Sequence, residues 1–333
     1  MDTRAIVLLF PGQGSQYARM AAGLYGHEPE FTAAMDEAFA AFGPDGRALR
    51  TDWLAASPAV PVDHVTRSQP LLFAVGHALG RMLLRRGVEP AALLGHSVGE
   101  MAAAVLAGVF TLEDAAALLL DRVHRLAAAP PGGMLAVAAT AAALEPFVTG
   151  EVVVAAVNAP RQTILAGPEG PLAEVARALA EAGLTCRPVP SLTAFHSPSL
   201  TAATAGAVER FAATAVAAPR IGLYSGYRAG PLTAELAADP AYWAGHPVEP
   251  VRFWPALDAV LRRHTGAVCV EAGPGQGLST IARQHPAVRG GTSRVVPLLP
   301  ARAGAPEADR EALAAAFAAL GAYVPGLSGA LLR

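Results

Sequence analysis

The stretch that decides the fold is Gly95-His96-Ser97-Val98-Gly99. An apolar run, Ala91-Ala92-Leu93-Leu94, precedes it, and a helix-like run follows over residues 100–106. This order of strand, glycine-flanked serine turn and helix is the context of a nucleophile elbow, in which glycines let the two backbones approach closely. The serine would lie at the helix N-terminus, where the helix dipole favours developing negative charge. The stretch therefore predicts an α/β fold with Ser97 as a nucleophile. The alternative is an ordinary turn with a capping serine.

The composition sets the class of protein. A chain of 333 residues is long enough for one large domain and a smaller one. Apolar residues make up 53% of it, but no apolar run reaches the length of a membrane span, and the N-terminal run 5–10 is too short for a secretory signal. Cys186 and Cys269 are the only cysteines, which argues against a disulfide framework or a cysteine-rich metal site. We therefore expect a cytoplasmic protein that does not act on a membrane.

The charged residues narrow the chemistry further. The chain has 25 basic and 27 acidic residues, a balance that does not indicate binding to nucleic acid. Every basic residue is arginine, so a lysine Schiff base and a Walker-type phosphate loop are both excluded. An anionic group must then be bound by a guanidinium, which can hold a carboxylate or a phosphate with two parallel hydrogen bonds.

Short apolar runs alternate with helical patterns over most of the chain, which favours a mostly parallel sheet covered by helices. The expected strands are 5–10, 91–94, 221–224, 268–271 and 295–298. The expected helices are 70–86, 100–107, 112–128, 198–215, 255–264 and 310–322. Thr111, with Asp114 three residues later, predicts the start of helix 112–128.

The middle of the chain has a different order of elements. It reads as strand 135–138, helix 141–148, strands 152–157 and 163–166, helix 171–182 and strand 186–189. This order is that of the ferredoxin-like unit, and it follows a hinge, Pro130-Pro131-Gly132-Gly133. We therefore predict a discontinuous core of residues 1–133 and 193–300, a ferredoxin-like insert of residues 134–192, and a C-terminal connector and helix over residues 301–333.

A nucleophilic serine needs a base, and the chain has nine histidines. His196 stands where the predicted insert returns to the core, and pockets form at such seams. It is therefore the candidate base. His96 adjoins the serine, but its side chain is expected to point away from the serine and to be buried and hydrogen-bonded.

Two further features could carry chemistry. The glycine-rich turn at 10–16 fails as a dinucleotide fingerprint because Tyr17 replaces the third glycine. Its backbone N–H groups could help to hold an oxyanion, and the alternative is a plain strand-to-helix turn. Arg122 lies inside a helix that is apolar on one side. It would either pair with an acid such as Asp121 or face a pocket and bind a substrate carboxylate.

Taken together, these residues resemble the malonyl-CoA:acyl carrier protein transacylases and the acyltransferase domains of polyketide synthases. The resemblance covers roughly residues 5–300. Its motifs are Pro-Gly-Gln-Gly-Ser-Gln at 11–16, Gly-His-Ser-Val-Gly-Glu at 95–100, Gln69-Pro70, the helix 111–122, 130–133, Asn-Ala-Pro at 158–160, Ala-Phe-His-Ser at 194–197, Glu-Pro-Val-Arg-Phe at 249–253, and 271–278. It implies a hydrolase-like α/β core, with a mostly parallel sheet, and a small ferredoxin-like α+β insert.

The resemblance also implies a role for individual residues. Ser97 would attack a thioester and carry the acyl group, and His196 would act first as base and then as acid. A backbone carbonyl would orient the histidine, and alignment of the motif at 249–250 assigns that carbonyl to His246. The backbone N–H groups of Gln13 and Val98 would form the oxyanion hole.

Substrate binding follows from the same resemblance. Arg122 would hold a malonyl carboxylate, since 122 − 97 = 25 matches the interval from serine to arginine in the family. Gln69 and Asn158 would line the pocket. Val98 and Phe195 resemble the malonyl-selective pattern, because a phenylalanine would crowd a 2-methyl branch.

Two departures from the family pattern concern the acyl group. Thr193 occupies a position where malonyl-type domains usually carry another residue. Val123-His124 follows Arg122 where a glycine is usual.

The implied activity is ping-pong transfer of a malonyl or related group from coenzyme A to the phosphopantetheine thiol of an acyl carrier protein, in polyketide or fatty-acid biosynthesis. We expect a free-standing, monomeric enzyme with no metal and no bound cofactor. An acidic carrier predicts an arginine-lined rim, with candidates Arg161, Arg187, Arg252 and Arg283. The alternatives are a shuttle between two carriers, a loader of an unusual acyl group, a hydrolase that edits acyl thioesters, and an inactive carrier-binding module.

Overall fold

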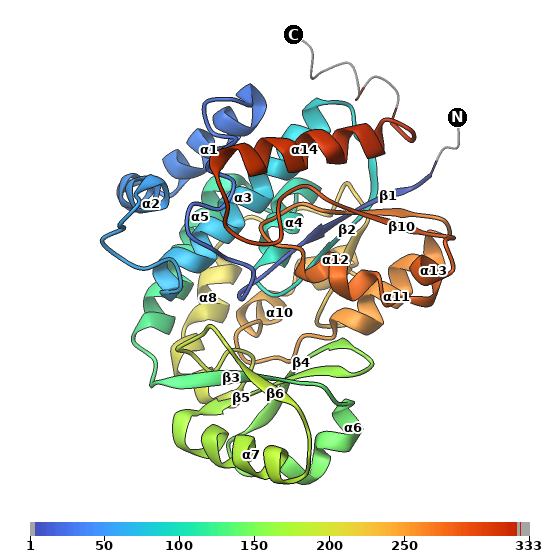
Figure 1. Ribbon diagram of the computed structural model, residues 1–333. Helices are drawn as coiled ribbons and strands as arrows, with labels where there is room; N and C mark the ends of the chain where they lie inside the picture. The colour runs from blue at the N-terminus through green and yellow to red at the C-terminus, as the bar shows by residue number, and fades with distance from the viewer. Residues whose placement is uncertain (1–3, 325–326, 328–333) are drawn as a thin grey trace.

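Two sheets of different size organise the molecule, and the computed structural model describes residues 4–324 and 327 (Figure 1). The larger sheet has the strand order β10-β9-β1-β2-β7-β8. Its strands are β1 (Ile6–Phe10), β2 (Pro90–Gly95), β7 (Leu223–Ser225), β8 (Gly230–Pro231), β9 (Val268–Glu271) and β10 (Arg294–Pro297). All neighbouring strands are parallel except β7 and β8. The mostly parallel sheet confirms the predicted α/β class.

Helices cover this sheet because its central strands are apolar throughout. All five residues of β1 are buried, as expected of a strand covered on both faces. The long helices of this layer are α1 (Pro29–Ala41), α2 (Pro44–Leu54), α3 (Val65–Arg85), α4 (Gly99–Ala107), α5 (Leu112–Ala127), α11 (Phe253–Arg263) and α14 (Pro306–Leu320). The shorter ones are α8 (Ala207–Ala212), α9 (Ala234–Ala237), α10 (Pro240–Ala244), α12 (Gly277–Ala282) and α13 (Pro286–Arg289). The predicted start of α5 is confirmed, since the Asp114 backbone N–H donates to the Thr111 hydroxyl at 3.0 Å.

The smaller sheet has the predicted ferredoxin-like order of elements. Its strands are antiparallel in the order β4-β5-β3-β6. They are β3 (Gly132–Val137), β4 (Val153–Ala159), β5 (Gln162–Pro168) and β6 (Cys186–Val189), with helices α6 (Ala141–Leu144) and α7 (Glu169–Glu181) and a 3₁₀ helix at Glu145–Phe147. This sheet and its helices have an apolar core of their own. The division of the chain at residues 134 and 192 stays a prediction. Strand β3 begins at Gly132, two residues before the predicted start of the insert.

The structure differs from the predicted elements at several places. Helix α3 begins at Val65, five residues before its predicted start, with Pro70 inside it. The single helix expected over 198–215 is instead a 3₁₀ helix (Pro198–Thr204) followed by α8. Gly206 separates them with φ = +74°, a conformation that ends a helix and that glycine adopts without strain. The last helix, α14, begins four residues before the predicted start, with a proline at its first position. Apart from residue 327, the predicted C-terminal segment beyond residue 324 lies outside the described residues. Strand β8 and helices α1, α2, α9, α10, α12 and α13 were not predicted.

The carboxyl ends of the parallel strands meet along one edge of the large sheet, and the small sheet lies on that side of the molecule (Figure 1). A pair of backbone hydrogen bonds joins the two parts: Val251 N–H donates to Ala155 C=O at 2.8 Å, and Val157 N–H donates to Val251 C=O at 2.8 Å. Loops that follow parallel strands form binding sites in open α/β sheets. This edge is therefore where a site is expected.

Two further properties of the fold bear on the class of protein. None of the helices in the described part of the chain combines the length and the apolar character that a membrane crossing needs. In residues 4–324 and 327, no three side chains of His, Cys, Asp or Glu gather as a metal site would require.

Candidate active site

The turn between β2 and α4 holds Ser97 in a conformation that L-residues rarely adopt, with φ = +53°. The two flanking glycines make the turn possible. A Cβ on Gly95 would lie 2.2 Å from the backbone nitrogen of Glu100, and one on Gly99 would lie 2.1 Å from the carbonyl oxygen of Phe10. No side chain fits at either position. This close approach of the backbones is the reason that a nucleophile elbow requires glycine at both positions.

His196 lies against this serine. Its Nε2 is 2.9 Å from the Ser97 Oγ, and both side chains are buried. Its Nδ1 is 3.0 Å from the carbonyl oxygen of His246 and 3.0 Å from that of Glu249. Carbonyl oxygens only accept hydrogen bonds, so Nδ1 carries the proton and Nε2 remains free to take a proton from the serine.

The surroundings keep this imidazole neutral. Burial, with a smaller contribution from the nearby His96, lowers the pKa of His196 to about 4, although the two carbonyl contacts act in the opposite direction. The backbone is also held, since His196 N–H donates to the Pro247 carbonyl at 2.7 Å, and φ at His196 is +61°. A neutral, fixed imidazole at pH 7 is ready to act as a base.

The glycine-rich loop after β1 packs directly on the elbow. A Cβ on Gly12 would lie 2.4 Å from the His96 carbonyl oxygen and 3.0 Å from the Ser97 Cβ. The backbone N–H groups of Gln13 and Val98 donate to no acceptor among the residues that the structure describes. Two such donors beside a nucleophile are what an oxyanion hole requires.

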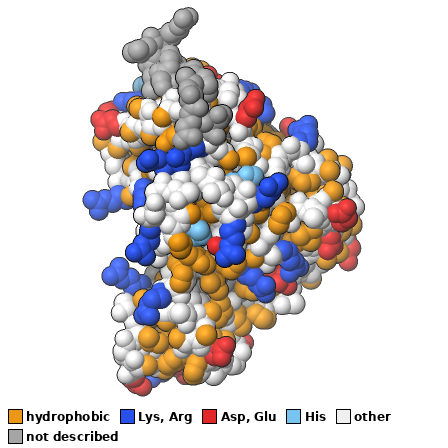
Figure 2. All heavy atoms as spheres, turned by 90° about the vertical axis from the view of Figure 1, so that its right-hand side faces the viewer, with side chains coloured by type: hydrophobic (Ala, Val, Ile, Leu, Met, Phe, Trp, Pro, Cys, Tyr) orange, Lys and Arg blue, Asp and Glu red, His pale blue; other side chains and the backbone are white. Residues whose placement is uncertain are grey.

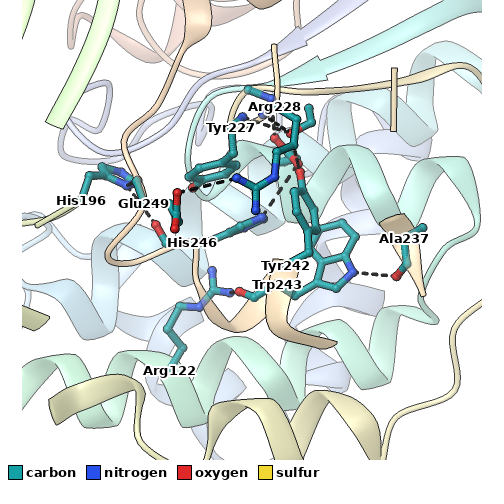
Figure 3. Close-up of polar contacts among 12 residues, drawn as sticks. Arg122, His196, Tyr227, Arg228, Ala237, Tyr242, Trp243, His246 and Glu249 are labelled. Carbon is teal, nitrogen blue, oxygen red and sulfur yellow. Dashed lines mark hydrogen bonds and ion pairs between the residues drawn. The ribbon is translucent and has the colours of Figure 1, made fainter. Parts of the chain in front are cut away.

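Arg122 brings a positive charge to the same place. Its Nη2 donates to the Trp243 carbonyl at 3.1 Å (Figure 3). The neighbouring Asp121 pairs with Arg125 instead, at 2.9 Å. Within the described residues no carboxylate is paired with Arg122, so its remaining N–H groups are available to an anion.

A small cavity of about 10 Å³ joins these groups. Its lining residues are Gln69, Ser97, Val98, Arg122, Leu126, Phe195, His196, Tyr227, His246 and Pro247. Leu126 and Phe195 also line a wider groove of about 690 Å³, which runs along β3, β6 and α7 of the small sheet. The site is therefore a small cavity that lies beside a wide groove.

Asn158 does not belong to this lining, contrary to the expectation from the sequence. Its Oδ1 lies 2.8 Å from the His96 Nε2, so its carboxamide orients His96 behind the elbow. The hydrogen bond predicted for His96 is thus confirmed. Burial lowers the pKa of His96, which makes a neutral imidazole the partner of this carboxamide.

Sequence reasoning missed Tyr227 and the carbonyl of Glu249. Tyr227 lines the cavity and stacks on the His246 ring, with centroids 4.0 Å apart and planes 16° apart. In the view of Figure 3 the His246 ring lies between Tyr227 and Arg122. Tyr227 comes two residues after the end of β7, so its place beyond a parallel strand was the available signal.

Comparison with known proteins agrees with this geometry. The chain belongs to the acyl transferase domain family, whose model matches residues 7–316. Within that family it is an acyltransferase related to the acyltransferase domains of polyketide synthases and to malonyl-CoA:acyl carrier protein transacylases.

Individual relatives show the extent of the similarity. A phenolphthiocerol/phthiocerol polyketide synthase protein of Mycobacterium tuberculosis is 35% identical over 282 residues, which are 84% of this chain and 19% of that protein. The chain thus spans about a fifth of that relative. The crystal structure of the acyltransferase domain from the second module of the salinomycin polyketide synthase superposes with a TM-score of 0.86 at 34% identity, over 97% of this chain and 74% of that one. The malonyl-CoA:acyl carrier protein transacylase of Xanthomonas oryzae gives 0.81 at 28% identity, over 95% and 99%.

Proposed function

We propose that this protein moves a malonyl group from coenzyme A to the phosphopantetheine thiol of an acyl carrier protein, through an acyl-serine intermediate. The observation that carries the proposal is the 2.9 Å contact between Ser97 and His196 in a cavity that also holds the guanidinium of Arg122. A nucleophile, a base and a carboxylate-binding group in one small cavity suit a carboxylated acyl thioester.

In the first half-reaction Ser97 Oγ attacks the thioester carbonyl while His196 Nε2 takes its proton. The oxygen of the tetrahedral intermediate receives hydrogen bonds from the backbone N–H groups of Gln13 and Val98. The carbon–sulfur bond then breaks, and His196 returns the proton to the departing thiolate of coenzyme A. The products are free coenzyme A and malonyl-Ser97.

The second half-reaction reverses this order with a different thiol. His196 removes the proton from the phosphopantetheine thiol of the carrier, and the sulfur attacks the ester carbonyl on Ser97. Collapse of the intermediate breaks the carbon–oxygen bond, and the proton passes back to Ser97 Oγ. No metal and no resident cofactor takes part in the proposed sequence, since coenzyme A and phosphopantetheine belong to the substrates.

Two residues support malonyl as the acyl group. Arg122 offers the charge-assisted hydrogen bonds that a second carboxylate needs. The Phe195 ring lines the cavity, where it would crowd a branch at the 2-position. The Xanthomonas relative is also named for malonyl transfer. Gln69 lines the same cavity with its Oε1 buried and unpartnered, and we propose it as a further contact to the acyl group.

The distribution of charge supports an acidic protein partner. Residues 250–305 carry seven arginines and only two carboxylates, whereas the whole chain has a net charge of −2. One of those carboxylates, Glu271, is buried. Figure 2 shows arginine side chains gathered over the middle of the face that bears α11, α12 and α13. Arg252 and Arg283 of this segment are exposed, as are Arg161 and Arg187 on the small sheet. We propose that the carrier docks on these arginines.

Steady-state kinetics with malonyl-CoA and a phosphopantetheinylated carrier test this function. A ping-pong mechanism predicts parallel lines in a double-reciprocal plot, and it predicts release of coenzyme A before the carrier is added. Turnover with water at the same rate as with the carrier would favour the editing hydrolase instead. The expectation of a free-standing, monomeric and cytoplasmic enzyme stays a prediction.

A further inference from the structure

A buried carboxyl group lies behind the nucleophile. Glu100 stands in the first turn of α4, three residues after Ser97, and its side chain is fully buried. One of its oxygens accepts a hydrogen bond from the backbone N–H of Gly226 at 2.8 Å, and the other contacts the hydroxyl of Tyr242. Within the described part of the chain, the basic atom that faces this carboxyl is the Nε2 of His246 at 3.9 Å, too far for a hydrogen bond. A group buried in this way is costly unless its hydrogen bonds are made.

The contacts of Glu100 continue into the loop after β7. The Tyr242 hydroxyl lies 2.6 Å from the Ser225 Oγ. That oxygen accepts hydrogen bonds from the backbone N–H groups of Tyr227 at 3.0 Å and Arg228 at 2.9 Å. Glu100 thus stands at one end of a chain of hydrogen bonds that fixes residues 225–228.

This chain reaches His196 by two routes. Tyr242 belongs to α10, which ends two residues before His246 (Figure 3). Tyr227 stacks on the His246 ring. The carbonyl of His246 in turn accepts from the Nδ1 of His196. One side of the network is therefore the helix of the nucleophile, and the other is the segment that orients the base.

We infer that Glu100 is a positioning residue for the proposed reaction. Through Tyr242 and Gly226 it holds in place the segment that orients His196 toward Ser97. The inference rests on the proposed function for its catalytic consequence. A misplacement of about 1 Å in such a pair can lower the rate about 100-fold, although the residue touches no reacting atom.

Two hydrogen bonds to the Glu100 side chain perform this role. Tyr242 has one proton and two oxygen neighbours, so one neighbour must donate to it. The Ser225 Oγ already accepts from two backbone N–H groups, so the Ser225 hydroxyl donates to Tyr242, and Tyr242 donates to Glu100. A glutamine has the same shape and a carbonyl oxygen that accepts from one of the two donors, whereas an alanine accepts from neither.

The test compares Glu100→Ala, Glu100→Gln and a control, Glu271→Ala. Glu271 is buried like Glu100 and also accepts two backbone N–H bonds, from Leu278 at 3.0 Å and Ser279 at 2.7 Å, but it ties β9 to α12 and contacts neither Ser97 nor His196. The first readout is the rate at which a fluorophosphonate probe labels the serine, measured well below the Tm of each variant. This rate reports the alignment of serine and histidine and needs no acyl substrate. The second readout is acylation by malonyl-CoA.

We expect Glu100→Ala to lower both rates about 100-fold, Glu100→Gln to restore part of the loss, and Glu271→Ala to lower Tm without changing the labelling rate of the folded protein. Should Glu100→Ala fail to fold, Tyr242→Phe breaks the same chain while keeping the ring, and we expect a loss of about tenfold.

Three results would overturn the inference: unchanged labelling in Glu100→Ala, or in Tyr242→Phe where that variant replaces it; equal loss in Glu271→Ala; or a Glu100→Gln variant as slow as Glu100→Ala. A wild-type protein that reacts with the probe but is not acylated by malonyl-CoA would overturn the proposed substrate and leave this inference standing.

Discussion

Replacing Arg122 by alanine removes the guanidinium from the cavity beside Ser97. Its Nη2 donates to the Trp243 carbonyl, and no carboxylate among the described residues pairs with it, so the remaining N–H groups can hold a substrate carboxylate. The alanine variant would leave that carboxylate in the same cavity with no cation beside it. The variant should therefore lose malonyl transfer and keep the serine chemistry.

The geometry of the arginine sets the size of the effect. A guanidinium can form two parallel bonds to a carboxylate. Each charge-assisted hydrogen bond contributes about 1.5–3 kcal/mol, so the pair contributes about 3–6 kcal/mol. Since each 1.4 kcal/mol is a factor of ten, kcat/KM for malonyl-CoA should fall by about 100- to 10,000-fold. Acetyl-CoA has no second carboxylate, so acetyl loading should not fall.

Intact-mass spectrometry of the protein mixed with equal amounts of malonyl-CoA and acetyl-CoA measures both effects at once. Arg125→Ala is the matched control, because Arg125 lies on the same helix but pairs with Asp121. The Arg122→Ala protein should carry acetyl in place of malonyl, and the control should carry malonyl as the wild type does. An unchanged ratio of malonyl to acetyl in Arg122→Ala would refute the carboxylate-binding role.

Four further outcomes are expected. Gly12→Ala puts a methyl group 2.4 Å from the His96 carbonyl oxygen and displaces the loop that carries the Gln13 N–H donor. The rate of acylation, measured by stopped-flow as release of coenzyme A, should therefore fall by at least about 100-fold. A near-normal rate would exclude this loop from the oxyanion hole. Since burial lowers the pKa of His196 to about 4, the base is neutral above that pH, so kcat/KM should rise with pH through about 4 and stay flat to neutrality; a midpoint near 6.5 would contradict this environment. Phe195→Ala should improve methylmalonyl loading relative to malonyl by about 10- to 200-fold, and a fixed ratio would remove this ring from specificity. Arg283→Glu should raise the KM for the carrier without changing the rate of acylation by malonyl-CoA. Arg47 is exposed on α2, and Arg47→Glu should change neither quantity. Equal effects of the two substitutions would contradict docking on the arginine face.

Local sterics explain what could be predicted about the nucleophile and the sheet. The two glycines of the elbow are required by contacts within a few residues of Ser97, apart from the approach of Phe10. The strands were recognisable because a parallel sheet buries whole apolar runs, and β9 was predicted with its observed bounds, Val268–Glu271. The order of elements in the small sheet followed in the same way from alternating short patterns.

Contacts between distant segments explain what could not be predicted. Asn158 bonds His96 across 62 residues of chain, and no local pattern distinguishes this from a place in the cavity. The second carbonyl on His196, that of Glu249, belongs to the backbone and leaves no mark in the sequence. Glu100 was visible as part of a motif, but its role depends on Tyr242, 142 residues away.

The helical segment after His196 shows a third kind of limit. Its residues have helical spacing over 198–215, but Gly206 at φ = +74° breaks it into two short helices. Glycine permits such a break without requiring it. Packing against the rest of the chain decides between the two outcomes.

The measurement that tests the central claim most directly is the location of the acyl group after rapid mixing with malonyl-CoA, proteolysis and mass spectrometry. The account predicts one malonyl ester, on the peptide that contains Ser97, formed before any carrier is added and not formed on the same time scale by the His196→Ala variant. Acylation of another residue, or Ser97 acylated equally fast without the histidine, would contradict it.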